Sequence, residues 1–137
     1  MTDDPCHVLD VVSCGHGDTL LLHLPGGKRC LVDCCLRDAG AKEALYSLFK
    51  LHSIRRLDMV CLTHPDVDHY WGMADVLKYF TSGGRSLGTF YLPPLGVKTI
   101  SRLLKRWRLQ GQSQEFDRLV DTLRDLAGKD KCKIRWI

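Results

Sequence analysis

The alternation of apolar and polar positions in the first half of the chain predicts short strands and one helix. Residues 6–13 and 19–24 alternate as half-buried strands do, and residues 25–28 predict a hairpin that leads to a third strand at 29–33. Residues 39–52 follow the helical period and predict an amphipathic helix. The apolar stripe of this helix consists of Ala44, Leu45, Leu48, Phe49 and Leu51.

The middle of the chain continues this exchange of strands and helices. Residues 57–63 are largely apolar and predict a strand buried on both faces of a sheet. A helix of roughly three turns is expected to start near Tyr70, and residues 87–92 predict the next strand. The apolar positions of that helix are Trp71, Met73, Ala74, Val76, Leu77 and Phe80. The order of hairpin, helix, strand, helix and strand predicts a layered α/β fold.

The last third of the chain predicts two more helices, one on either side of a polar break at residues 110–113. Gly128 is the expected end of the second helix, and residues 131–137 alternate like a further strand. The apolar positions are Ile100, Leu103, Leu104 and Trp107 in the first helix and Phe116, Leu119, Val120, Leu123 and Ala127 in the second.

Composition and charge limit the domain number, the localisation and the state of the cysteines, but say little about the partner. The chain has 137 residues, of which 45% are hydrophobic, as is typical of one small globular domain. It has no apolar run long enough to span a bilayer and no leader at its start, so the expected localisation is cytoplasmic. The seven cysteines are odd in number and include adjacent Cys34 and Cys35, which favours reduced thiols over a disulfide framework. The formal net charge of +4 is modest and only hints at an anionic partner.

The densest run of candidate metal ligands comes directly after the predicted buried strand. Its two imidazoles and two carboxylates suit Zn²⁺, Mn²⁺ or Fe bound beside a water. They belong to His64, Asp66, Asp68 and His69. Pro65 keeps His64 out of the helical region, so the side chains of His64 and Asp66 are expected to project to one side of an extended segment. The alternative is a helix N-terminus at which Asp66 or Asp68 caps backbone N–H groups.

This run resembles the H-x-H-x-D-H signature of the metallo-β-lactamase superfamily, with Asp66 where many members have their second histidine. Residues 63–72 read T-H-P-D-V-D-H-Y-W-G and are similar to the S/T-H-P-D-x-D-H-x-x-G variant of one branch. That branch contains the hydrolase domain of the DNA-uptake channel protein ComEC/Rec2. Residues 12–22, 26–28 and 31–35 also resemble the opening of the branch, which is V-G-x-G-D-x-x-L-I, a Pro/Gly hairpin and L-I-D-x-G.

The resemblance covers about residues 7–95 and implies the first half of a metallo-β-lactamase αββα sandwich, a mixed sheet covered by helices. In the family the remaining ligands come from a second half, and no histidine follows the motif here. We therefore expect residues 1–137 to be the N-terminal part of a single hydrolase domain, with the rest of the fold supplied by the same or another chain. A half sandwich leaves one sheet face uncovered, so we expect the isolated chain to aggregate or to form oligomers.

By the same resemblance, the complete site would hold two divalent metal ions, Zn²⁺ or Mn²⁺. His64 and Asp66 would help to hold one ion. Asp68 and His69 would hold the other, and Asp68 would also act catalytically by orienting the water that the ions activate. The carboxylate of Asp66 makes the first site harder, which shifts the preference toward Mn²⁺ and favours a phosphodiester substrate over a β-lactam.

Two upstream residues are expected to support this site. Asp33 ends a strand near the expected site edge and is predicted to orient a ligand histidine. A solvated carboxylate at a strand end is an equal alternative for it. His16 lies between two glycines and is predicted to line the site, although an exposed turn histidine is at least as good an account.

A basic segment in the last third predicts a contact with nucleic acid. Its positive charges suit a phosphate backbone and Trp107 suits stacking on a base, whereas the alternative is a solvated helix face with Trp107 in the core. The basic residues are Lys98, Arg102, Lys105, Arg106 and Arg108.

The leading functional hypothesis is a metal-dependent hydrolase, a phosphodiesterase or nuclease that acts on DNA through a metal-activated water. The resembling branch is linked with DNA strand degradation, and its relatives also occur as effector modules in bacterial antiviral proteins. The second hypothesis is a thioester, lactone or other small-ester hydrolase. The third is a non-catalytic interaction module with an incomplete metal site.

Overall fold

A six-stranded mixed sheet forms the frame of the protein, and the computed structural model describes it within residues 7–93 and 113–137. The first three strands pair antiparallel through tight turns, and the later ones pair in parallel because helices lie between them in the chain. In sheet order the strands are β1 (Val8–Ser13), β2 (Asp18–Leu24), β3 (Lys28–Val32), β5 (Arg56–Cys61), β6 (Ser86–Leu92) and β7 (Lys133–Trp136). A 3₁₀ turn η1 (Pro25–Gly27) joins β2 to β3, and a short strand β4 (Cys34–Cys35) follows β3.

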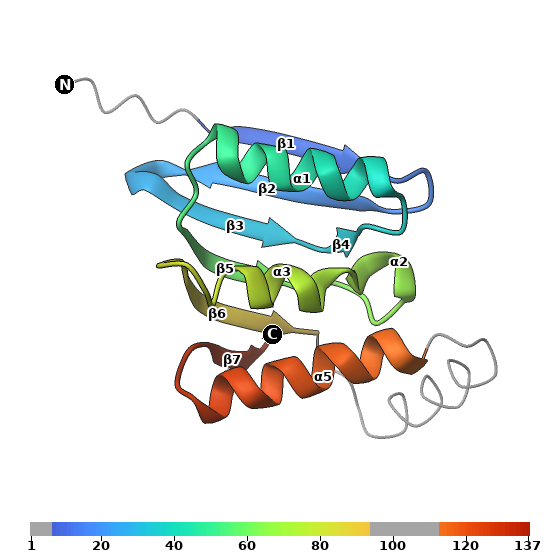
Figure 1. Ribbon diagram of the computed structural model, residues 1–137, viewed down its shortest axis with the longest axis vertical. Helices are drawn as coiled ribbons and strands as arrows, with labels where there is room; N and C mark the ends of the chain where they lie inside the picture. The colour runs from blue at the N-terminus through green and yellow to red at the C-terminus, as the bar shows by residue number, and fades with distance from the viewer. Residues whose placement is uncertain (1–6, 94–112) are drawn as a thin grey trace.

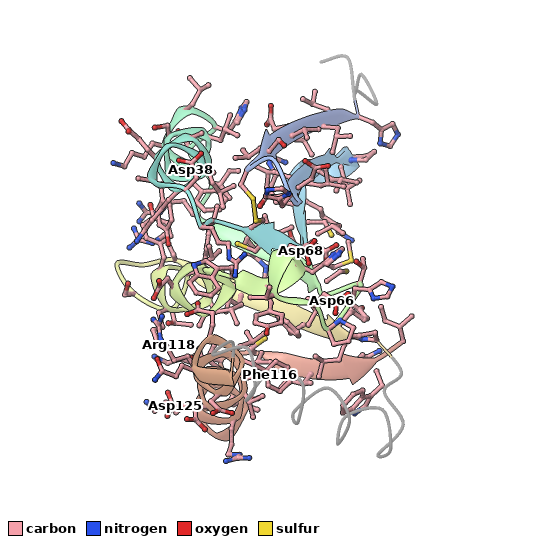
Figure 2. All side chains as sticks on the ribbon, turned by 90° about the vertical axis from the view of Figure 1, so that its right-hand side faces the viewer. Asp38, Asp66, Asp68, Phe116, Arg118 and Asp125 are labelled. Carbon is pink, nitrogen blue, oxygen red and sulfur yellow. A yellow bond between two sulfur atoms is a disulfide. The ribbon has the colours of Figure 1, made fainter. Side chains whose placement is uncertain are left out.

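Three helices lie on one face of this sheet (Figures 1 and 2). They are α1 (Ala39–Leu51), α3 (Met73–Tyr79) and α5 (Ser113–Gly128). Beneath them Leu21, Leu31 and Phe90 are fully buried in the hydrophobic core. No helix in the described part of the chain covers the opposite face, on which Leu9 and Val11 are 54% and 55% exposed. The α/β fold class is confirmed, in the form of a mixed sheet with one covered face.

The strand that leads into the motif, β5, is less buried than its apolar sequence suggested. Leu57 and Val60 are buried, as a strand covered on both faces requires. Met59 and Cys61, which alternate onto the same side of the strand as Leu57, nevertheless keep part of their surface exposed. The prediction of burial on both faces is therefore wrong for this strand.

The two long helices present slightly different stripes from those predicted. In α1 the buried residues Ala41, Leu45 and Phe49 follow a spacing of four, whereas Ala44 and Leu51 are exposed. Their side chains form the i, i+4 row that faces the sheet, and this row is rotated relative to the predicted stripe.

Helix α5 ends at the predicted Gly128 and buries Leu119 and Leu123, as expected. Leu126 is buried in place of Ala127, which is exposed. None of the helices in the described residues is both long and apolar enough to cross a membrane.

The helix predicted after the motif is divided into α2 (Val67–Tyr70) and α3 by Trp71 and Gly72. The N–H of Leu36 donates to the carbonyl oxygen of Trp71 at 2.9 Å, so this segment pairs with the chain beside β4 instead of continuing the helix. Gly72 has a φ of +88°, and a Cβ there would lie 2.8 Å from the Cβ of Leu36. Its N–H donates to the buried carboxylate of Glu115 at 3.1 Å. These long-range contacts end the helix, and the local apolar period does not reveal them.

Cys14 and Cys35 form a disulfide, so the prediction of reduced thiols is wrong for this pair. The turn after β1 folds back on β4 and brings two residues that are 21 positions apart to a Cα–Cα distance of 6.3 Å. The free cysteines of the described residues are Cys30, Cys34, Cys61 and Cys132. Burial raises the pKa of the Cys34 thiol, which therefore behaves as a small apolar side chain.

Candidate metal centre

Asp33 and Thr63 meet at one edge of the sheet, because they follow the adjacent parallel strands β3 and β5. The N–H of Asp33 donates to the carbonyl oxygen of Cys61 at 2.8 Å, which extends the pairing of the two strands beyond their ends. The Asp33 carboxylate accepts hydrogen bonds from the backbone N–H of Thr63, at 2.7 Å, and from the Thr63 hydroxyl. Asp33 is thus a buried, fixed carboxylate and not a solvated strand end.

His69 lies in α2 and points back to this carboxylate. Its Nδ1 is 2.8 Å from Oδ2 of Asp33. An ionised aspartate binds the protonated Nδ1, which leaves the lone pair of Nε2 available as a ligand. That Nε2 lies 3.9 Å from Oδ1 of Asp68. Asp33 thus lies behind the His69 ring, and Asp68 lies in front of it. A carboxylate that binds one ring nitrogen in this way turns the other nitrogen toward a metal ion.

His64 and Asp66 form a second, more open pair beside His69. Nδ1 of His64 lies 3.8 Å from Oδ2 of Asp66, and their side chains are 67% and 52% exposed. The ring centroids of His64 and His69 are 5.5 Å apart. Asp66 stands at the N-cap position of α2 but makes no capping hydrogen bond with its side chain, so the capping alternative does not hold for it. Figure 2 looks onto this strand edge and shows Asp66 and Asp68 near one another.

The motif therefore brings its donors together in pairs. Within residues 7–93 and 113–137, no three His, Cys, Asp or Glu donors of the motif come within 4.8 Å of one another. A metal ion held by the motif alone would require rotation of the exposed His64 and Asp66 side chains. Any further ligand must come from outside these four residues.

The turn between β1 and β2 packs directly against the motif. A Cβ on Gly17 would lie 2.5 Å from the carbonyl oxygen of Asp68 and 3.1 Å from the Cβ of Cys35, so the backbone of the turn touches the site. The disulfide between Cys14 and Cys35 fastens this turn to β4. The neighbouring His16 is exposed, so the structure places it near the site edge without a contact that assigns it a role.

A model of the metallo-beta-lactamase superfamily matches residues 12–86, more than half of the 137 residues. The chain belongs to this superfamily. No curated protein matches the sequence. Superfamily membership indicates a metal-dependent hydrolase, and the matched residues begin near the end of β1 and include β2 to β5 together with the whole motif.

The residues present fit the divalent ions that metallo-beta-lactamase proteins typically bind. Neutral imidazole and carboxylate are the ligand types of hydrolytic zinc and manganese sites. The hydrogen bond between Asp33 and His69 supports a metal site more strongly than the ligand types do, because it fixes which nitrogen of His69 faces outward.

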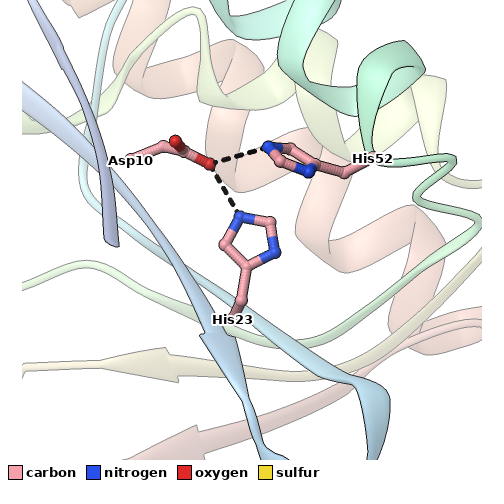
Figure 3. Close-up of side chains that lie close together, drawn as sticks. All are labelled: Asp10, His23 and His52. Carbon is pink, nitrogen blue, oxygen red and sulfur yellow. Dashed lines mark hydrogen bonds and ion pairs between the residues drawn. The ribbon is translucent and has the colours of Figure 1, made fainter. Parts of the chain in front are cut away.

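Sequence reasoning missed one group of donors altogether. Asp10, His23 and His52 come from β1, β2 and the end of α1, and their ligand atoms lie within 4.8 Å of one another (Figure 3). In the sequence they appear as isolated residues, with no common motif to link them. Only the pairing of Asp10 with Leu21 on β2, two residues before His23, would have placed two of the three on the same face.

The basic segment and the helix predicted at its position lie outside the described residues. The structure therefore contributes nothing to the expected nucleic-acid contact of this segment. Its five residues are Lys98, Arg102, Lys105, Arg106 and Arg108.

Proposed function

We propose that this chain contributes the metal-binding motif of a phosphodiesterase or nuclease that acts on DNA. The observation that carries the proposal is the hydrogen bond of 2.8 Å between Asp33 and Nδ1 of His69. It holds the imidazole with Nε2 toward Asp68, and a hydrolase with a metal-bound histidine needs such an orientation. A metal-dependent hydrolase is what superfamily membership indicates, and the substrate class is the step beyond it.

The proposed roles follow the two pairs of side chains. His64 and Asp66 would hold one Zn²⁺ or Mn²⁺ ion, and Asp68 with His69 the other. The ions would supply Lewis acidity, which lowers the pKa of water toward neutrality and offsets negative charge on a phosphate.

The residues of the chain itself have separate tasks in this proposal. Asp33 positions His69 through Nδ1 and keeps the proton on that nitrogen. Asp68 orients the attacking water, because its carboxylate is half-exposed beside Nε2 of His69. The backbone of Gly17 supports Asp68 from behind and limits its movement.

A phosphodiester is favoured over a small ester for two reasons. Asp66 replaces imidazole by carboxylate, and hard oxygen ligands favour oxygen-loving ions such as Mn²⁺. Residues 63–72 also resemble the DNA-uptake channel branch, which is linked with DNA strand degradation and includes antiviral effector modules. We therefore assign DNA as the substrate and keep thioesters and lactones as comparison substrates.

The remaining ligands are proposed to come from a second half of the domain, in the same polypeptide or in another chain. The motif forms pairs and not a closed cluster within the described residues, which agrees with an incomplete set of ligands. Residues 1–137 would then be the N-terminal part of one hydrolase domain. The exposed apolar residues of the uncovered sheet face, Leu9 and Val11 among them, would drive association of the isolated chain.

A non-catalytic interaction module is the second candidate. It is favoured by the exposure of His64 and Asp66, because a catalytic site usually buries its ligands in a pocket. Such a module would keep the contact between Asp33 and His69 as a structural link without turnover.

The test combines metal content by mass spectrometry with degradation of single-stranded DNA in the presence of Mn²⁺. We expect residues 1–137, assembled with the second half of the domain, to bind metal and cleave DNA and the His69→Ala variant of the same assembly to lose both. The control variant is His7→Ala, which removes an exposed histidine outside the motif. Bound metal without cleavage of DNA, thioester or lactone would favour the interaction module. Cleavage that persists in His69→Ala would contradict the assignment of the site.

A further inference from the structure

Two histidines and one aspartate converge at the end of the sheet away from the motif. Nε2 of His23 lies 2.7 Å from Oδ2 of Asp10, and Nε2 of His52 lies 3.1 Å from the same oxygen. The two imidazole rings are 4.4 Å apart between centroids and inclined at 64°. Figure 3 shows both rings turned toward the carboxylate, so three donor atoms point into one small volume. We call these residues the hairpin cluster.

From this geometry we infer that the hairpin cluster is a second metal site, which binds one divalent cation of the zinc class. Its three ligand atoms would be Oδ2 of Asp10 and the Nε2 atoms of His23 and His52.

The distances suit a tetrahedral ion after small movements. Zinc bonds to nitrogen and oxygen of about 2.1 Å place the ligand atoms of a tetrahedral site roughly 3.4 Å apart. The two measured separations of 2.7 and 3.1 Å are slightly shorter than this, and all three atoms lie within 4.8 Å. An ion would therefore move Asp10 away from His23 by about 0.7 Å and away from His52 by about 0.3 Å.

The surroundings of the hairpin cluster favour a bound cation. His23 is buried beneath the sheet-facing side of α1, whereas His52 and Asp10 are half-buried and leave a route for an ion. His52 is the C-cap residue of α1, where the negative end of the helix dipole attracts positive charge. Two imidazoles and a carboxylate form a donor set that prefers zinc to magnesium or calcium.

The hairpin cluster is separate from the strand-end motif. A strand rises about 3.3 Å per residue, so His23 lies on the order of 20 Å along β2 from Gly17, which touches Asp68. In Figure 1, α1 runs from the β4 side of the sheet to the opposite edge, where it ends at His52. A metal ion at the cluster would tie the β1–β2 hairpin to the end of α1 and would not touch the motif.

The competing account is a metal-free hydrogen-bond network, in which both histidines donate to Asp10. That network would need the Nε2–H form of both rings. The two accounts make different predictions, since only a metal site loses its stabilisation when a chelator is added.

The experiment uses the His69→Ala background, so that zinc uptake by the motif is weakened. Zn²⁺ is added to this chain after chelation, and its binding is measured by calorimetry and by thermal melting. We expect about one equivalent of Zn²⁺ and, at zinc concentrations near 100 times Kd, a rise in Tm of roughly 10 °C. Adding His52→Gln should weaken zinc binding at least tenfold and abolish the rise in Tm. Gln retains an N–H that can donate to Asp10, so the metal-free fold is expected to persist.

Two further variants complete the design. Asp10→Asn removes the ligand charge with little change of shape and should also abolish the rise in Tm. His7→Gln removes an exposed histidine outside the hairpin cluster and should leave zinc binding unchanged. The inference is overturned if the His69→Ala chain binds no zinc, or if it binds zinc equally well after His52→Gln and Asp10→Asn. Neither result depends on catalysis, so the proposed nuclease function is judged separately.

Discussion

The strand-end motif and the hairpin cluster are two groups of metal-ligand residues with opposite properties. The four motif residues lie within positions 64–69, yet their side chains are half or largely exposed and approach one another in pairs at 3.8 and 3.9 Å. The hairpin cluster draws on three elements separated by up to 42 positions, from Asp10 to His52, yet its donors meet at 2.7 and 3.1 Å. Closeness in sequence gives a recognisable signature, whereas closeness in space depends on pairing across the sheet.

The two groups also differ in the contacts that hold their side chains in place. The motif depends on supports outside itself, namely the carboxylate of Asp33, the backbone of Gly17 and the disulfide of Cys14 and Cys35. The hairpin cluster depends mainly on the β1–β2 register and the end of α1. Changes at the supports of the motif should therefore leave zinc binding at the hairpin cluster intact.

The largest expected effect comes from removing the disulfide with the double substitution Cys14→Ala and Cys35→Ala. A cross-link over 21 positions is expected to contribute about 3 kcal/mol to the free energy of unfolding, measured in urea with chelator present. The freed turn should also weaken metal binding at the motif, since Gly17 supports Asp68. Zinc binding at the hairpin cluster should stay the same.

The control for the disulfide is Cys61→Ala, which removes a half-buried free thiol. It should cost less than half as much stability as the double variant and leave both metal sites unchanged. Equal losses from both changes would mean that packing, and not the cross-link, holds the turn against the motif.

Asp33→Asn should have the next largest effect. The amide cannot hold the proton on Nδ1 of His69 as an ionised carboxylate does. Losing such a support typically costs 10–100-fold in metal affinity, so we expect about a 30-fold loss at the motif. The measurement is Mn²⁺ affinity by calorimetry, beside zinc affinity at the hairpin cluster, which should not change.

Asp38→Asn is the matched control for this loss. Asp38 caps α1 by accepting from the N–H of Gly40 at 2.7 Å, and asparagine caps equally well. Its Mn²⁺ affinity should equal that of the wild type. If Asp38→Asn weakened Mn²⁺ binding as much as Asp33→Asn, general loss of charge would explain both results.

The sequence predicted most of the frame but only one of these two groups. The strands and the long helices were predicted near their observed bounds, because alternation and helical period are local signals. The break at Gly72 was missed, since it depends on Leu36 and Glu115, which lie far away along the chain. The disulfide was missed for the same reason, because its partners are joined by a turn that folds back on β4.

For the site, Asp33 was predicted to orient a motif histidine, and it lies 2.8 Å from Nδ1 of His69, while the orienting role itself stays a prediction. The ends of adjacent parallel strands meet at one edge, and this rule can be applied to a sequence alone. The hairpin cluster could not be predicted in this way, because no rule linked the end of α1 to the beginning of β1 before the packing was known.

A smaller effect is expected from Gly17→Ala. Gly17 needs no positive φ, so the added Cβ acts only through its contact with Asp68 and Cys35. Overpacking of this kind costs about 1 kcal/mol or somewhat more, and we expect a loss of Mn²⁺ affinity below that of Asp33→Asn. Gly128→Ala, which adds a Cβ in open space, is the control and should keep full affinity. Unchanged Mn²⁺ binding in Gly17→Ala would show that the turn does not support the motif.

The smallest effect is expected at Asp58, a carboxylate that accepts hydrogen bonds from other residues of the chain and needs no metal ion. Burial opposes its ionisation, but hydrogen bonds from the backbone N–H of Arg29 and from Arg56, both at 2.9 Å, outweigh burial and hold the pKa of Asp58 below its usual value. A lowered folded-state pKa contributes stability above the unfolded pKa of about 3.9, and this contribution is lost as the pH falls through the folded value.

Asp58→Asn should therefore lower the Tm slightly at pH 7 and by progressively less as the pH falls below about 3.9, as measured by thermal melting from pH 7 to pH 2 in the presence of chelator. The response of thermal melting to added zinc separates Asp58 from Asp10. Asp58 joins β3 to β5 through Arg29 with no need for a cation, so added zinc should leave its pH profile unchanged. Asp10 faces two imidazoles, and if it is a metal ligand its substitution should change melting chiefly when zinc is present. If the Tm of Asp10→Asn changes with pH but not with added zinc, Asp10 stabilises the fold without a metal, as Asp58 does. The contrast between the motif and the hairpin cluster would then no longer hold.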